Sequence, residues 1–156
     1  MKNGGYDVGF KHSTKIDSTR TYQIKNEYNR QFINRPIPIS IWYPANIKKH
    51  NSESLTVLDY LEILKAEEEW ENLPNYFLLD WFPYLWNTPE NKAHLSENVS
   101  AIANAAILDG QFPVVVYAAS YQSSSIENFV LFEYLASHGY VVISSPSRGT
   151  DTRWLE

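Results

Sequence analysis

Residues 112–146 read FPVVVYAASYQSSSIENFVLFEYLASHGYVVISSP, and this stretch decides the fold class. Its opening, 112–118, is a short run rich in β-branched valine, typical of a strand buried on both faces of a parallel sheet. Residues 126–138 then have the apolar spacing of a helix. Gly139 is placed to end that helix as its C-cap, and 140–146 form a second buried strand. Strand, helix and strand in this order predict a βαβ unit. The inward helix positions are expected to be Phe129, Val130, Phe132, Leu135 and Ala136.

The first 45 residues are predicted to form paired strands. Val8 lies at the start of one strand, and the short polar stretch 16–20 is typical of a hairpin tip, so that 20–24 would return alongside it. Residues 36–44, PIPISIWYP, alternate apolar with small or polar residues, as a half-buried strand does. The prolines at both ends of this strand indicate a sheet edge or a strand terminus.

Residues 46–110 are predicted to form a helical, aromatic-rich excursion within the domain. Leucines at three-residue spacing from Leu55 to Leu64 indicate a helix, and Thr56 with Asp59 resembles a capping box at its start. Aromatic residues crowd the stretch 70–86, where they either shape an apolar acyl pocket or pack against the sheet, and packing is favoured. The apolar residues between 95 and 107 return to helical spacing.

The composition limits the possible classes of protein. The chain has 156 residues, 44% of them hydrophobic, which fits one domain with a real core. A net charge of −5 disfavours nucleic acid as a partner, because phosphate binding requires clustered cations. The sequence has no cysteine, so disulfides and cysteine-ligated metals are excluded. The acidic run 67–69 is interpreted as a solvated helix face, and no metal site is predicted. No apolar run approaches the roughly 20 residues of a transmembrane helix. A soluble protein is expected, with the compartment left open between the cytoplasm and secretion after signal removal.

Two stretches carry a resemblance to a known family. RPIPISIWYPA at 35–45 and EYLASHGYVVISSP at 133–146 resemble the N-terminal half of the platelet-activating-factor acetylhydrolase and dienelactone hydrolase branch of the α/β-hydrolases. The resemblance runs from about Val8 to Gly149. It implies that 1–156 is a single partial domain, the N-terminal half of an α/β-hydrolase. It also implies serine-type hydrolysis of a small apolar or short-acyl carboxylic ester, with no cofactor.

The resemblance also implies where the catalytic groups should be. The family carries its nucleophile on a G-x-S-x-G elbow after the fifth strand, followed by an acid and then a histidine. No G-x-S-x-G occurs in the sequence, so we expect no nucleophile, acid or base in this chain, and no activity from the chain alone. The histidines are not where the family places its base; they are His12, His50, His94 and His138. His138 is interpreted as a C-terminal helix residue that favours the helix dipole.

One catalytic element is expected within the chain. The family uses a backbone N–H after the third strand to stabilise the oxyanion of the tetrahedral intermediate. By register from the strand, this donor falls at Tyr121, with Ser120 and Gln122 beside it as candidate substrate-binding residues. Many relatives have His-Gly just before this position, whereas this chain has Ala119-Ser120, and serine resists backbone geometry that glycine permits. The alternative is that the loop is only a flexible connector.

The serines at 123–125 are not interpreted as nucleophiles, because the sequence places no histidine partner nearby. Loop and helix-capping roles are favoured for them.

Two other functions remain open from the sequence. A non-catalytic α/β-hydrolase-like binding or interaction module is possible because Ala-Ser replaces His-Gly. A nucleotide-binding βαβ unit is disfavoured, since no glycine lies between 118 and 125 to cradle a phosphate. Without a fifth strand, the first strand of the βαβ unit would expose an apolar edge. We therefore expect self-association through that edge, or pairing with the missing C-terminal half of the fold.

Overall fold

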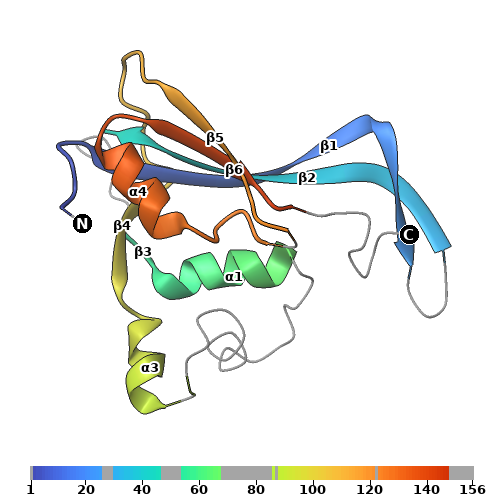
Figure 1. Cartoon of the computed structure of the whole chain (residues 1–156), viewed down its shortest axis with the longest axis horizontal. Helices are drawn as coiled ribbons and strands as arrows, with labels where there is room; N and C mark the ends of the chain where they lie inside the picture. Colours follow the sequence, from blue (N-terminus) through green and yellow to red (C-terminus); the bar gives the residue numbers. More distant parts are fainter. Residues whose placement is uncertain are drawn as a thin grey trace.

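The computed structural model describes residues 2–25, 30–46, 54–67, 86, 88–121 and 123–147. Six strands within these ranges form one mixed sheet, in the spatial order β3-β4-β1-β2-β6-β5. The strands are β1 (Asp7–Lys25), β2 (Arg30–Ala45), β3 (Ser54–Thr56), β4 (Asn98–Ala103), β5 (Val114–Ala118) and β6 (Val141–Ser145), and the helices are α1 (Val57–Glu67), α3 (Pro89–His94) and α4 (Phe129–Ser137). Figure 1 shows the sheet running across the molecule with α4 and α1 beneath it.

Strands β1 and β2 form a long antiparallel ribbon that projects beyond the other strands (Figure 1). The predicted hairpin tip at 16–20 is wrong, because β1 continues through it. The register instead shifts between Asp17 and Thr21, as at a bulge that absorbs extra residues without ending the pairing. Pairing continues to Lys25 and Arg30, so the connection lies at 26–29, outside the described residues.

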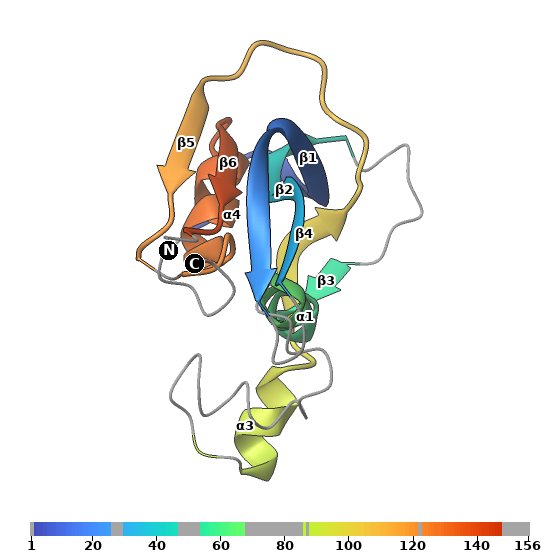
Figure 2. The same cartoon turned by 90° about the vertical axis from the view of Figure 1, so that its right-hand side faces the viewer.

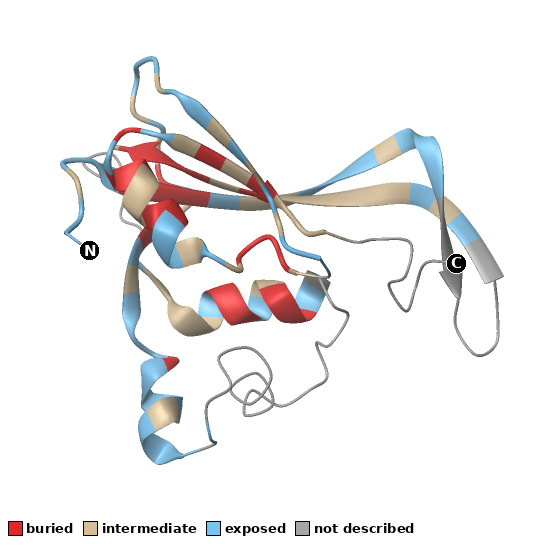
Figure 3. Ribbon diagram, viewed as in Figure 1, coloured by how far each residue is buried: buried red, intermediate tan, exposed pale blue. Residues whose placement is uncertain are grey.

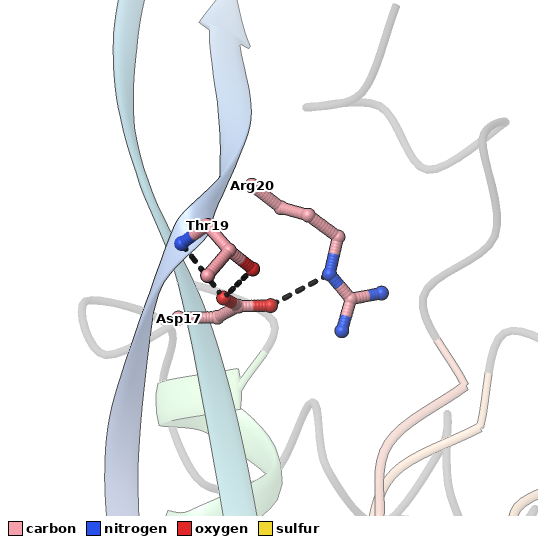
Figure 4. Close-up of polar contacts among 3 residues, drawn as sticks. All are labelled: Asp17, Thr19 and Arg20. Carbon is pink, nitrogen blue, oxygen red and sulfur yellow. Dashed lines mark hydrogen bonds and ion pairs between the residues drawn. The ribbon is translucent and has the colours of Figure 1, made fainter.

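Polar contacts of Asp17 stabilise the bulge (Figure 4). Its carboxylate accepts the backbone N–H of Thr19 at 2.9 Å, the Thr19 hydroxyl at 2.6 Å and the Arg20 Nε at 2.6 Å. The hydrogen bond from the Thr19 hydroxyl, followed by that from Arg20, lowers the pKa of Asp17 to about 2. These contacts are local to the bulge on the ribbon, and their role is structural.

The strand, helix and strand predicted for the last third of the chain are confirmed. Strands β5 and β6 pair in parallel, from Val114 opposite Val141 to Ala118 opposite Ser145, and α4 connects them. Gly139 follows the C-cap with a φ of +91°, in the left-handed region that favours glycine. This unit determines where the loop after β5 lies.

The main core lies between the sheet and the two longer helices. Trp42 of β2 contacts Phe132 of α4 with ring centroids 4.8 Å apart and Phe10 of β1 at 4.9 Å, while Tyr60 of α1 stacks on Phe129 at 4.4 Å. Burying each large side chain contributes about 1.5–3 kcal/mol to stability. Figure 3 shows the buried residues concentrated where α1 and α4 meet the sheet. Both helices therefore contribute to one core cluster.

Strand β5 is less buried than the sequence predicted. It is the last strand on its side of the sheet (Figure 2), and its residues alternate in exposure, with Val114 57% and Val116 77% exposed. Val115 and Tyr117 face the core instead. The described helices that contribute to the core lie against that face, so the opposite side of β5 lacks the cover that a strand buried on both faces needs. Val130 was likewise predicted to face inward but is exposed, because it lies off the buried stripe of α4.

The segment 46–110 contains strands as well as helices, which corrects part of the prediction. Helix α1 begins as expected, since Thr56 N–H donates to the Asp59 carboxylate at 2.7 Å and Asp59 N–H donates to the Thr56 hydroxyl at 3.3 Å. The predicted helix across 95–107 is wrong, because β4 occupies 98–103 and pairs with β1 and β3. Its apolar spacing fits either structure, and pairing with neighbouring strands decided the outcome.

The aromatic run 70–86 lies almost entirely outside the described residues. Its last member, Trp86, is described and is 83% exposed.

Candidate functional site

The candidate site is the loop after β5, at residues 119–125. Because β5 and β6 are parallel, their carboxyl ends meet at the same end of the sheet, where ligands of α/β folds commonly bind. Ser147 N–H, just past β6, donates to the Ser123 carbonyl at 3.0 Å and ties the two loops together. Tyr121, the predicted oxyanion donor, lies in this loop with its side chain 66% exposed. Ser120 precedes it, whereas Gln122 lies outside the described residues.

A carboxylate organises the start of this loop. Glu127 Oε1 accepts the backbone N–H of Ser120 at 2.7 Å and the Tyr117 hydroxyl at 2.8 Å. Burial acts to raise the pKa of Glu127, but hydrogen bonds from Ser120, Ser123 and Tyr117 outweigh it and the pKa is lowered. The carboxylate is therefore ionised at neutral pH. This role of Glu127 was not predicted from the sequence, although an acidic residue follows directly after the loop.

The described contacts of Ser124 and Ser125, at the end of this loop, are structural. Ser125 is fully buried, and its hydroxyl lies 2.7 Å from that of Ser40, which in turn lies 2.9 Å from Nδ1 of His12. Ser40 is also fully buried, so neither hydroxyl can reach a substrate in this arrangement. Ser124 Oγ accepts the N–H of Ile126 at 3.3 Å. The contacts of Ser40 with His12 and Ser125 join residues 28 and 85 positions apart, so no local motif signals them.

His138 lies at the C-cap of α4, as predicted. Its Nδ1 lies 2.8 Å from the carbonyl oxygen of Tyr134 and donates to it in the tautomer that carries a hydrogen on Nδ1. His94 instead contacts Glu97 at 2.6 Å on the surface, far along the chain from the loop after β5. His50 lies outside the described residues.

A buried carboxylate, that of Glu133, joins three elements of the core. Glu133 of α4 accepts the Tyr60 hydroxyl at 2.9 Å and the backbone N–H groups of Ser100 at 3.0 Å and Ala101 at 3.3 Å. Trp42 Nε1 donates to the same Tyr60 hydroxyl at 2.7 Å. Burial raises the pKa of Glu133, and these hydrogen bonds oppose the shift. The network holds α4 to α1 and β4, and it was not predicted.

The described residues show neither a cluster of metal-ligating side chains nor a membrane-spanning helix. In the ranges that the structure covers, no three His, Asp or Glu side chains gather to hold a metal ion. Among the helices described there, none has the length and apolar character to span a bilayer.

Comparison with known proteins places the fold. No family model matches the chain, and no curated protein matches it. Nine solved chains do match. One is a ferulic acid esterase from Streptomyces cinnamoneus, with a TM-score of 0.57 and 20% sequence identity, and the similarity covers 91% of this chain. The fold is esterase-like. The chain spans 34% of the length of that esterase, and its mixed sheet with few helices is compatible with part of an α/β fold.

Proposed function

We propose that this chain forms the N-terminal portion of a carboxylic-ester hydrolase of the platelet-activating-factor acetylhydrolase and dienelactone hydrolase-like kind. The observation that carries the proposal is the similarity to an esterase fold along 91% of the chain. The loop after β5 supports it, because this loop lies at the carboxyl end of two parallel strands. The substrate class is a small apolar or short-acyl ester, cleaved by serine-type acyl transfer without a cofactor.

In this proposal the chain contributes an oxyanion donor. The backbone N–H of Tyr121 would stabilise the negative charge that develops on the ester carbonyl oxygen. Loss of one such donor reduces kcat by about 10²–10³-fold in enzymes of this chemistry. Ser120 and Gln122, on either side, would contact the substrate.

The nucleophile, the acid and the histidine base are proposed to come from outside these 156 residues. In the described part of the chain, Ser40 and Ser137 each lie within hydrogen-bond distance of a histidine, and both are buried. A buried hydroxyl cannot attack a bound ester. The isolated chain is therefore proposed to be inactive.

The exposed edge of β5 is proposed to pair with another strand. Its outward residues are apolar, and the strand carries no charge or proline that would block edge pairing. The partner would be the remainder of the fold or, in its absence, a second copy of the chain.

A non-catalytic binding or interaction module of the same fold is the second candidate. It is favoured by one observation, the Ala119-Ser120 pair in place of His-Gly before the oxyanion donor. The fold alone does not distinguish the two, because one fold supports many functions.

Labelling with a fluorophosphonate probe tests the proposal. The complete product of the gene that encodes this chain is treated with the probe and assayed for hydrolysis of p-nitrophenyl acetate. Labelling together with hydrolysis supports the esterase. A folded product, checked by circular dichroism, that neither labels nor hydrolyses the ester overturns it and favours the binding module. The 156-residue chain alone should give neither signal.

A further inference from the structure

The Glu127 carboxylate lies between the end of β5 and the start of α4. Its Oε1 accepts the Ser120 N–H at 2.7 Å and the Tyr117 hydroxyl at 2.8 Å. Ser120 immediately precedes the proposed oxyanion donor, Tyr121. The carboxylate therefore binds the backbone N–H of the residue before the proposed donor.

The Tyr117 hydroxyl that contacts the Glu127 carboxylate is itself fixed by neighbouring residues. The Tyr117 hydroxyl that donates to it accepts a hydrogen bond from Asn128 Nδ2 at 2.7 Å. The Tyr117 ring packs edge-on against Phe132, with centroids 4.8 Å apart, and Phe132 is buried in the core. Glu127 is thus held by Tyr117 of β5, whose own position is restrained by Asn128 and Phe132.

Two hydrogen bonds fix two successive peptide planes of the loop. The bond from Ser120 N–H to Glu127 fixes the plane between Ala119 and Ser120. The Ser120 carbonyl accepts the Ser123 N–H at 2.9 Å, which fixes the next plane. That second plane also carries the Tyr121 N–H, which points opposite to the Ser120 carbonyl in a trans peptide. The direction of the Tyr121 N–H is therefore set by contacts of Ser120.

We propose that Glu127 is a positioning residue that orients the Tyr121 N–H toward the substrate oxygen. The proposal rests on the esterase function proposed above. It is consistent with Ala119-Ser120 in place of His-Gly, because the acceptor holds the Ser120 N–H without a positive φ; among the described residues other than glycine, only Asn104 has one. Because the same carboxylate occupies the Ser120 N–H, the donor to the oxyanion is Tyr121 and not Ser120.

A simpler role for Glu127 is to stabilise the N-terminus of α4 by its charge. The two roles predict different results. A dipole contact changes the stability of the helix and leaves the loop amides and the catalytic rate unchanged. A positioning contact acts through the hydrogen bond, so a neutral acceptor should restore part of the effect.

The test compares Glu127→Ala, Glu127→Gln and the matched surface control Glu90→Ala in the complete gene product. Hydrogen exchange of the Ser120 amide is measured first. A hydrogen bond to a charged group contributes about 1.5–3 kcal/mol. Its loss in Glu127→Ala should therefore speed exchange of the Ser120 amide by about tenfold or more, and Glu127→Gln should give a smaller increase. The control should exchange as the unmodified protein does.

Ester kinetics form the second measurement. With p-nitrophenyl acetate, kcat should fall by about tenfold or more in Glu127→Ala and less in Glu127→Gln, while KM changes little, because the contact serves the transition state. Unchanged Ser120 exchange, equal kcat losses in both variants, or a rise in kcat would each overturn the positioning role. If the unmodified protein hydrolyses no ester, the proposed function fails, while the exchange experiment still reports on the backbone contact.

Discussion

Glu133→Leu tests the buried network that joins α4 to α1 and β4. Leucine is close in size to glutamate, so the main loss is the acceptor for three donors. The Ser100 N–H is near the surface and can bond water, whereas Ala101 and Tyr60 are fully buried. An unpaired buried donor costs about 1–3 kcal/mol. Removing a carboxylate from the core recovers part of its desolvation penalty. We expect a net loss of about 2–3 kcal/mol in the free energy of unfolding.

The pH dependence of this loss follows from the raised pKa of Glu133, which burial causes. Since the folded-state pKa lies above the unfolded-state value, the stabilisation by Glu133 is complete below the usual glutamate range. It is lost as pH rises through the folded pKa. The destabilisation by Glu133→Leu should therefore be larger at pH 4 than at pH 8. Both values lie away from the isoelectric point near 5.4, where solubility is lowest.

Urea unfolding followed by tryptophan fluorescence measures the change, with Glu90→Leu as the exposed control. Equal m-values are required for the comparison. A loss below about 0.5 kcal/mol at both pH values, which is the range of neutral surface substitutions, would refute the reasoning. A loss that is greater at pH 8 would refute the assigned direction of the pKa shift.

The remaining predictions concern the βαβ unit and the ribbon. Gly139→Ala should destabilise the fold by about 1–2 kcal/mol in the same urea assay, because alanine resists the left-handed backbone; a change near zero would contradict this. The Asp17 carboxyl should titrate by NMR with a midpoint near 2, and Thr19→Ala should raise that midpoint by removing the hydroxyl donor; an unchanged midpoint would disprove the contact. Val116→Lys should reduce self-association of the chain in sedimentation, since a lysine blocks edge pairing, while Val130→Lys, at an exposed valine on α4, should not. A monomeric unmodified chain would contradict edge pairing.

Local sequence signals predicted the elements that depend on near neighbours. The Thr56 and Asp59 pair marks the start of α1, and Gly139 marks the end of α4. The valines of β5 and β6 around that helix indicate a parallel pair, because a strand, helix and strand of these lengths have few other arrangements. These features could be predicted because each depends on residues only a few positions apart.

Contacts between distant segments decided the rest. The apolar spacing at 98–103 fitted a helix, but pairing with β1 and β3 made it a strand. The outward exposure of Val116 depends on which helices cover the sheet, and the Glu133 contacts with β4 join residues more than 30 positions apart.

For the candidate site, the sequence determined where the loop after β5 falls and which residue follows Ser120. Only the tertiary structure placed the Glu127 carboxylate on the Ser120 N–H, with Tyr117 and Phe132 behind it. A hydrogen bond requires a distance and a direction that the order of residues does not specify. The packing of α4 on the sheet, with Phe132 against Tyr117, supplies both.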